Sequence, residues 1–218
     1  MLVKDRMTPN PITVTKQTTV MDALQLMQKH KFRRLPVMEG DKLIGIVTDR
    51  DLSRLTPSPA TTLSAFELNY LLEKSTVADA LAKNHRLITI SPNAFIEEAA
   101  LLMRDNNIGA IPVVDDGKLV GIITETNIFD AFVDIMGLRE SSYRINIILD
   151  TDRSGVLAEL TKTIAENDGN ITHITTYYNP ANPNEVSIVI RLDKGNIEPI
   201  MEAITNLGYK AEYIRTNQ

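Results

Sequence analysis

The residues best suited to binding chemistry occur in two short strings, "GIVTDRDL" from Gly45 and "GIITETNI" from Gly121. In the first string an extended apolar run ends at Thr48, and Asp51 follows one helical turn later. A threonine at a helix start can cap the backbone amides and offer its hydroxyl to a phosphate. A carboxylate one turn further on repels phosphate but accepts hydrogen bonds from a neutral diol such as ribose. The pair indicates a nucleotide site, although a threonine cap with a first-turn aspartate also occurs without any ligand.

Two arginines, Arg33 and Arg34, directly precede the extended run that starts at Leu35. A guanidinium makes charge-assisted contacts to phosphate, so either arginine could complete the phosphate end of such a site. Gly45 has no side chain, and another backbone or a ligand can therefore approach it closely.

The second string differs from the first in charge. Thr124 is kept, but Asn127 stands where the first copy has an aspartate, and Glu125 adds an anion nearby. Gly109 and Ala110 stand where the first copy has its two arginines. We therefore expect the second copy to bind more weakly or to take a less charged ligand.

The two strings belong to an internal repeat. A shift of 76 residues lays the chain on itself without a gap from Ile12 to Leu52, and "VKDRM" echoes "VADAL" at a shift of 74. Each copy predicts a short strand, a helix, two strands joined by a turn, and a second helix. A β-α-β-β-α unit of this size cannot cover its own sheet, so the copies should pack as a pseudo-symmetric pair.

Apolar periodicity predicts which helix faces are buried. Thr19 with Asp22 resembles a capping box before the first helix, and Asn93 is the expected cap of its counterpart. The expected buried faces are Val20, Ala23, Leu24 and Met27 in the first copy and Ile96, Ala99, Ala100 and Met103 in the second.

The repeat stops after about Gly137. Beyond it, "YRINIIL", "NITHITTYY", "EVSIVIRL" and "YKAEYI" predict strands, whereas "SGVLAELTKTIAEN" and "IEPIMEAITNL" predict helices. The first of these helices should bury Val156, Leu157, Leu160 and Ile164, and "NPANPN" predicts a turn-rich loop. The order βαββαβ is that of a ferredoxin-like sandwich. The fold class is therefore α/β (α+β), with residues 1–56 and 77–137 as repeats, 57–76 as a linker that turns helical, and 143–218 as a further domain.

Composition narrows the classes of function. The chain has no cysteine, which excludes disulfides, thiolate metal sites and a cysteine nucleophile. A net charge of -5 argues against broad contact with nucleic acid or an anionic membrane. The N-terminus lacks the apolar stretch of a signal peptide, and no apolar run approaches the length of a membrane span. We expect a soluble, cytoplasmic protein with no direct nucleic-acid or membrane partner.

Catalytic or metal chemistry finds little support in the sequence. The three histidines, His30, His85 and His173, are scattered and lack the spacing of a metal site. Aspartates at 115–116 and 150–152 fit turns better than metal loops. No nucleophile accompanies Asp51, so we expect no enzymatic activity, no metal and no required cofactor.

The repeats resemble a pair of CBS domains, often called a Bateman module, over about Met1 to Phe132. The motifs "MTPNPITV", "RRLPVMEGDKLIGIVTDRDL" and "IPVVDDGKLVGIITETNI" occur in the expected order. The resemblance implies binding of AMP, ADP, ATP or S-adenosylmethionine in clefts between the repeats, with Asp51 on ribose and Thr48 near phosphate. The implied main site is Pro11, Ile12, Thr13, Arg33, Arg34, Pro36, Thr48 and Asp51. The implied second site is Ile88, Ala110, Pro112, Thr124 and Asn127.

Tyr143 to Ile214 resembles an ACT domain, through "DTDRSGVLAELTKTIAENDGNITHI". ACT domains often pair side by side and bind amino acids at the interface. The family's binding loop maps to Arg153, Ser154 and Gly155, and its second-strand entry maps to Asn170 and Ile171. Gly155 could instead only make a turn, and Asn170 only start a strand. A CBS pair followed by an ACT domain resembles acetoin-utilisation B-type proteins.

Two functions follow as alternatives. In the first, the chain is a ligand-sensing regulator, a homodimer or larger, whose nucleotide-dependent state is passed to its ACT domain or to a partner protein. In the second, it is a non-catalytic assembly protein whose modules bind no ligand and only associate.

Overall fold

The computed structural model describes residues 1–55, 74–81, 87–139, 143–151 and 153–215. The chain divides into two compact units, Met1–Phe129 and Asp130–Gln218. Of the linker predicted at residues 57–76, only the last three residues are among those described. Within the described residues, no helix is both long enough and apolar enough to span a membrane.

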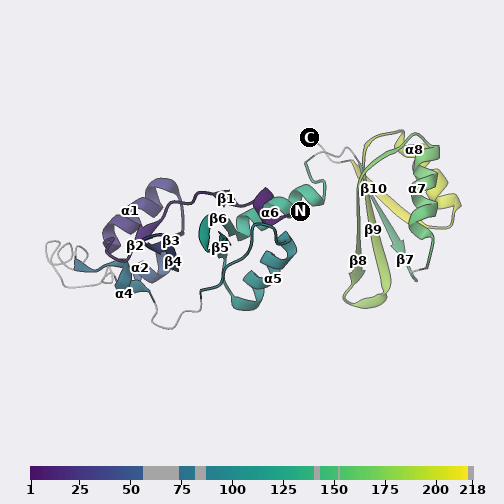
Figure 1. The fold of residues 1–218 in the computed structure, drawn as a ribbon. Coiled ribbons are helices and arrows are strands. Elements are labelled where there is room, and N and C mark those ends of the chain that lie inside the picture. Colours follow the sequence, from purple (N-terminus) through teal and green to yellow (C-terminus); the bar gives the residue numbers. More distant parts are fainter. Residues whose placement is uncertain (56–73, 82–86, 140–142, 152, 216–218) are drawn as a thin grey trace. The chain divides into compact units, whose positions relative to one another are not determined.

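The first repeat contains a small sheet and two helices (Figure 1). Its elements are β2 (Val14–Thr15), α1 (Val20–His30), β3 (Arg34–Glu39), β4 (Lys42–Thr48) and α2 (Asp49–Ser53). In the described residues β2 lies parallel to β3, and β3 pairs antiparallel with β4. The predicted cap of α1 is confirmed, since Thr19 Oγ1 accepts from the Asp22 amide at 3.0 Å and donates to its carboxylate at 2.7 Å.

The second repeat follows the same plan with α5 (Ile96–Asn106), β5 (Ala110–Asp115), β6 (Lys118–Thr124) and α6 (Glu125–Ile135). The prediction that Asn93 caps α5 is wrong. The helix begins at Ile96, where the Phe95 amide donates to Glu98 Oε1 at 3.0 Å. The Asn93 side chain instead accepts from Lys4 Nζ at 2.9 Å, and that contact belongs to the N-terminal segment.

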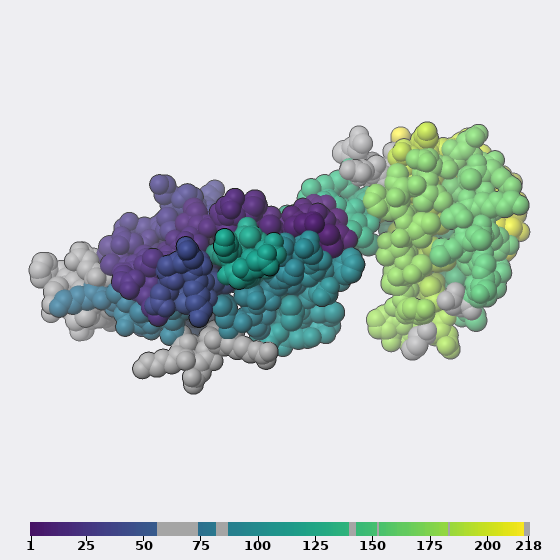
Figure 2. Space-filling view, viewed as in Figure 1, coloured from purple at the N-terminus to yellow at the C-terminus, as the bar shows by residue number. Residues whose placement is uncertain are grey.

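The first residues of each repeat pack on the other repeat. The N-terminal turn η1 (Val3–Asp5) bonds to the second repeat, with the Val3 amide 2.9 Å from the Ala94 carbonyl. Strand β1 (Thr8–Pro9) then pairs antiparallel with β6. In the reverse direction, α4 (Val77–Ala80) joins the first repeat through the Val77 amide, 2.9 Å from the carbonyl of Thr18. Figure 2 shows purple atoms of the N-terminal segment directly against teal atoms of the second repeat.

Two glycines make room for the exchanged segments. A Cβ at Gly45 would lie 2.8 Å from the Leu81 side chain, and one at Gly121 would collide with the sulfur of Met7. Close approach at Gly45 was expected from the sequence, and a side chain of this chain fills that space.

The predicted helix faces are buried, except that two of their residues, Leu24 and Ala100, are only partly buried. Val20, Ala23 and Met27 of α1 are buried with Val77 in one cluster, whereas Leu24 packs against its edge. In α5 the buried residues are Ile96, Ala99 and Met103, and Ala100 is half-buried.

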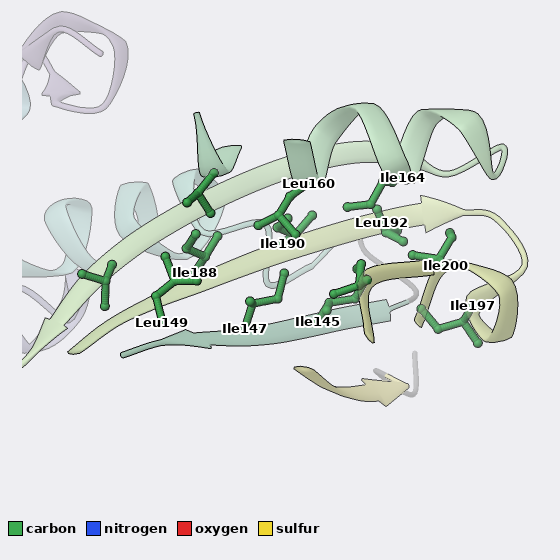
Figure 3. Close-up of a cluster of buried hydrophobic side chains, with 13 residues drawn as sticks. Ile145, Ile147, Leu149, Leu160, Ile164, Ile188, Ile190, Leu192, Ile197 and Ile200 are labelled. Atoms are coloured by element: carbon green, nitrogen blue, oxygen red, sulfur yellow. The ribbon is translucent and has the colours of Figure 1, made fainter. Parts of the chain in front are cut away.

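The second unit is a four-stranded antiparallel sheet covered by two helices on one face, in the order β10-β7-β9-β8 among the described residues. Its elements are β7 (Tyr143–Leu149), α7 (Val156–Glu166), β8 (Asn170–Asn179), β9 (Asn182–Lys194), α8 (Ile197–Asn206) and β10 (Lys210–Arg215). Figure 3 shows aliphatic side chains from β7 and β9 meeting those of both helices. The ferredoxin-like order and the α/β fold class predicted from the sequence are confirmed.

Two local predictions in this unit differ from the structure. "NPANPN" contains the predicted turn, but the turn is confined to Pro180 and Ala181, because β8 ends at Asn179 and β9 begins at Asn182. Leu157 is not in the core: 43% of it is exposed, whereas its neighbour Val156 is 3% exposed.

The exchange of segments predicts paired effects on stability. Val3 and Val77, equivalent at the shift of 74, are both fully buried. Val3→Ala and Val77→Ala should each lower the free energy of unfolding by about 2 kcal/mol, since each opens a cavity in the opposite repeat. Chemical denaturation would measure both, with exposed Gln17→Ala as the control. A loss for Val77→Ala with none for Val3→Ala would mean that the N-terminal segment does not dock on the second repeat.

Candidate functional site

Thr48 and Asp51 form a reciprocal cap at the start of α2. Thr48 Oγ1 accepts from the Asp51 amide at 3.1 Å, while the backbone amide and hydroxyl of Thr48 donate to Asp51 Oδ2 at 3.0 and 2.6 Å. The capping role predicted for Thr48 is present. Its hydroxyl already donates to Asp51, so a phosphate could accept this hydrogen bond only in place of the carboxylate. The second carboxylate oxygen, Oδ1, lies outside the cap and can accept from a ligand hydroxyl.

Thr124 and Asn127 repeat this cap with different chemistry. The amide and hydroxyl of Thr124 donate to Asn127 Oδ1 at 2.9 and 2.8 Å. A backbone amide can only donate, so the side-chain oxygen must face it and Nδ2 must point away. The first site thus presents an acceptor and a negative charge to a ligand, whereas the second presents a neutral donor.

Arg34 lies beside Thr48 but reaches the second repeat. The two residues are direct partners across β3 and β4, so their side chains share one face of the sheet. The guanidinium Nη2 lies 4.0 Å from Oε2 of Glu125, the first residue of α6. Arg33 points to solvent, and its carbonyl accepts from the Asp49 amide at 3.0 Å. Arg34 therefore lies near the starts of both α2 and α6.

The other residues of the implied nucleotide sites differ in their burial. Pro11 and Ile12 are half-buried and Thr13 is exposed, just before β2 begins at Val14. In the second repeat Ile88 is half-buried. The remaining members are buried, Pro36 on β3 and both Ala110 and Pro112 on β5. Ala110 is the direct cross-strand partner of Thr124, as Arg34 is of Thr48.

A cavity of about 340 Å³ lies in the second unit, beside the start of α7. It is lined by Arg153, Gly155, Val156, Leu157, Ala158, Thr176, Tyr178, Val186 and Ile188. Gly155 is the N-cap of α7, with φ of 91°, so that no capping side chain stands over the first helical amides. An anionic group would be stabilised there by those amides and by Arg153. The exposed Leu157 gives the cavity part of its apolar wall.

The ACT residues expected at one site are only partly brought together. Arg153 and Gly155 line the cavity, and Ser154 is exposed between them. Asn170 and Ile171 begin β8, and the strand registers place Ile171 level with Tyr143 at the opposite end of the sheet. Seven strand positions separate the two ends, or about 20 Å at the usual rise per residue. Within one copy these two groups of residues do not form a single site.

Arg153, which lines the cavity, also belongs to a polar cluster. Its Nη2 lies 2.9 Å from Glu159 Oε2 and 2.7 Å from the Tyr209 hydroxyl, which in turn donates to Glu159. The Tyr209 hydrogen bond and then the Arg153 hydrogen bond hold the pKa of Glu159 below its ordinary value of 4.5. Desolvation, followed by the bond to Glu159, raises the pKa of Tyr209. Glu159 is thus charged at neutral pH and keeps Arg153 beside the cavity.

Some contributors were missed in the sequence. Glu125 was expected beside the second cap, but its contact with Arg34 was not, because no local pattern links residues so far apart. Thr176 and Tyr178 line the cavity through strict alternation along β8, a signal that was available in "HITTYY". Among the described residues, no group of three or more His, Asp or Glu side chains is placed to hold a metal ion. His85 lies outside those residues.

Comparison with known families assigns both units. The CBS domain family matches residues 3–57 and 75–134, and the ACT domain family matches residues 143–209. The chain belongs to the CBS-domain family and carries an ACT domain after the CBS pair. The matched residues of this CBS–ACT protein include both capping pairs, so the resemblance predicted from the motifs is confirmed.

Relatives of the CBS–ACT protein, and solved structures of similar proteins, share its CBS part. A CBS domain-containing protein of Dictyostelium discoideum is 34% identical over 62% of this chain and 93% of its own length. The chloroplastic CBSX2 of Arabidopsis thaliana is also 34% identical, over 64% of this chain and 67% of its own. The structure of an AcuB protein from Vibrio cholerae, assigned to acetoin utilization, has a TM-score of 0.53 at 29% identity and covers 64% of this chain and 96% of that chain. CBSX2 in complex with AMP has a TM-score of 0.51 at 32% identity, with coverages of 62% and 97%.

The two caps predict that asparagine can replace aspartate at the first without loss of structure. Asp51→Asn should change the free energy of unfolding by less than about 0.5 kcal/mol, because Asn127 makes the same bonds in the second repeat. Asp51→Ala should cost about 1 kcal/mol, since it removes the acceptor of two hydrogen bonds. Urea denaturation of the three proteins would measure this. If the asparagine and alanine variants lost equal stability, the cap would require the charge of Asp51.

Proposed function

We propose that this CBS–ACT protein is a non-catalytic regulatory protein that binds an adenosine nucleotide at the Thr48–Asp51 end of its first repeat. The observation that carries the proposal is the cap itself. It directs one carboxylate oxygen of Asp51 to the backbone and leaves the other for a ribose hydroxyl. CBSX2, whose solved structure holds AMP, supports the choice of ligand class.

Each part of the nucleotide has a proposed contact. The ribose hydroxyls donate to Asp51 Oδ1, which is a strong acceptor because it is charged. The phosphate lies near Arg34, which shares its sheet face with Thr48. The adenine meets the segment Pro11–Thr13, where the chain has not yet entered β2.

The second cap is proposed as a weaker site. Asn127 Nδ2 can donate to a ribose oxygen, but it lacks the charge that strengthens the bond. Glu125 stands beside it with 61% of its side chain exposed, and its carboxylate repels a phosphate. A nucleotide with fewer charges, or S-adenosylmethionine, suits this site better than ATP.

The cavity of the ACT domain supports a second proposed ligand, an amino acid with an apolar side chain. Arg153 and the first amides of α7 suit a carboxylate, and the walls from Leu157, Val186 and Ile188 suit an aliphatic or aromatic group. Strand β8 is an edge of the sheet with exposed Ile174, Tyr177 and Tyr178.

Antiparallel pairing of two copies through β8 is the proposed dimer contact. Such pairing sets the start of one β8 beside the end of the other. Asn170 of a second copy would therefore lie near the cavity, whereas Asn170 of the same copy lies about 20 Å from it. The predicted amino-acid residues would then form a single site at the interface.

Thermal melting tests the nucleotide proposal. AMP, ADP, ATP and S-adenosylmethionine would be added to protein stripped of bound ligand, and a ligand at 100 times its Kd should stabilise the fold by about 2.7 kcal/mol. Asp51→Asn should lose most of the AMP shift while its cap remains, because its amide, like that of Asn127, would bind ribose only weakly. Asp22→Asn, which alters an equivalent cap at α1, is the control and should keep the shift. No shift with any nucleotide would favour the alternative of an assembly protein without ligands.

The amino-acid proposal has its own matched pair of variants. Ala158→Phe should fill the cavity and abolish the melting shift produced by leucine, isoleucine, valine or phenylalanine. Ala165→Phe, two turns later on the same helix and exposed, lies outside the cavity and should keep that shift. Loss of the shift in both variants, or no shift in the wild type, would contradict an amino-acid site at this cavity.

A further inference from the structure

The contact between Arg34 and Glu125 joins the two repeats at the proposed nucleotide site. Arg34 comes from β3 of the first repeat and Glu125 from the start of α6 in the second. Their closest nitrogen and oxygen are 4.0 Å apart, with 29% and 61% of the side chains exposed. This distance exceeds that of a hydrogen bond, so the two groups attract each other loosely and can separate at little cost.

A glycine makes this contact sterically feasible. A Cβ at Gly109 would collide with Arg34 Nη2 and with Glu125 Oε2, so both charged groups lie over its α-carbon. The carbonyl of Gly109 also accepts from the Glu125 amide at 3.2 Å, which fixes the start of α6 beside it. Any larger residue at this position would force the arginine and the glutamate away.

The contact exists in one direction only. At the shift of 76, the counterparts of Arg34, Gly109 and Glu125 are Ala110, Arg33 and Asp49. Ala110 has no charge to offer Asp49, and Arg33 occupies the position where a glycine would be needed. The repeat is thus symmetric in its caps and asymmetric in this ion pair, which leaves one arginine to serve the phosphate end of the proposed site.

We propose that Glu125 holds Arg34 when no ligand is bound, and that a nucleotide phosphate binds by taking this arginine from it. Glu125 is then the residue that sets how strongly the site selects for phosphate charge. This inference rests on the proposed nucleotide site at Asp51. Glu125, a residue of the second repeat, then controls the binding of a ligand held mainly by the first repeat.

The physical reason lies in competition for one guanidinium. A phosphate offers two oxygens and more than one charge, so it binds arginine more strongly than a single exposed carboxylate at 4.0 Å. Glu125 opposes that binding twice, because it competes for Arg34 and repels the phosphate. It has neither effect on adenosine, which carries the same base and ribose without phosphate.

Calorimetric titration with AMP and adenosine separates these effects. Glu125→Gln should tighten AMP binding by about three- to fivefold and change adenosine binding by less than about twofold. Asp49→Asn, the matched control, removes one charge at the equivalent helix position but leaves the Arg34 contact in place. It should change the binding of either ligand by less than about twofold. In an Arg34→Gln background, Glu125→Gln should lose most of its effect on AMP.

The outcomes distinguish this inference from the proposed function. Equal tightening of AMP by Glu125→Gln and Asp49→Asn would show a general charge effect and overturn the role of Glu125. Unchanged or weaker AMP binding in Glu125→Gln would overturn it as well. If neither AMP nor adenosine bound the wild type, the nucleotide site itself would be contradicted. If both bound and depended on Asp51, the proposed function would stand whatever the result at Glu125.

Discussion

Burial of Val3 and Val77 in opposite repeats is the constraint on which the first unit depends. A β-α-β-β-α repeat of this size leaves part of its sheet uncovered, and the first residues of each repeat pack on the other repeat. Gly45 and Gly121 allow the covering residues to approach. Because the exchange ties the repeats together, β4 and β6 face each other and Arg34 comes within reach of α6. The proposed site therefore depends on contacts between residues that lie far apart along the chain, such as Val3 with Ala94 and Val77 with Thr18.

The same local structure supports different chemistry in the two repeats. Thr48 with Asp51 and Thr124 with Asn127 make the same set of hydrogen bonds, so the backbone does not distinguish a carboxylate from an amide. What differs is the group turned outward, which is a charged acceptor in one repeat and a neutral donor in the other. This separation of structural and binding roles explains how one repeat can keep its fold while its ligand preference changes.

Local signals in the sequence predicted most of the elements. Alternation predicted β7, β9 and β10, and the threonine caps of α1 and α2 followed from residue type and spacing. The exchange of segments could not be predicted from the sequence. The similarity at a shift of 74 shows that the two segments are equivalent, but it does not show which repeat each segment packs on.

Contacts between distant residues set the limit of prediction for the sites as well. Nothing around Arg34 indicates that its guanidinium lies over Gly109, because that depends on the packing of two repeats. Leu157 fits the apolar periodicity of α7, yet it lines a cavity. Helix periodicity shows which side of a helix is apolar, but it does not show how far the sheet extends beneath that side. Arg153 and Asn170 match one family's site, but the strand register sets them at opposite ends of the sheet.

A crystal structure of the protein with bound AMP would show which cap holds the nucleotide. We expect the ribose hydroxyls to lie within hydrogen-bond distance of Asp51 Oδ1, with the cap to Thr48 intact. We also expect Arg34 to contact the phosphate and no longer to lie beside Glu125. AMP bound at Asn127 alone, or bound with its ribose away from both caps, would contradict a nucleotide site at Asp51.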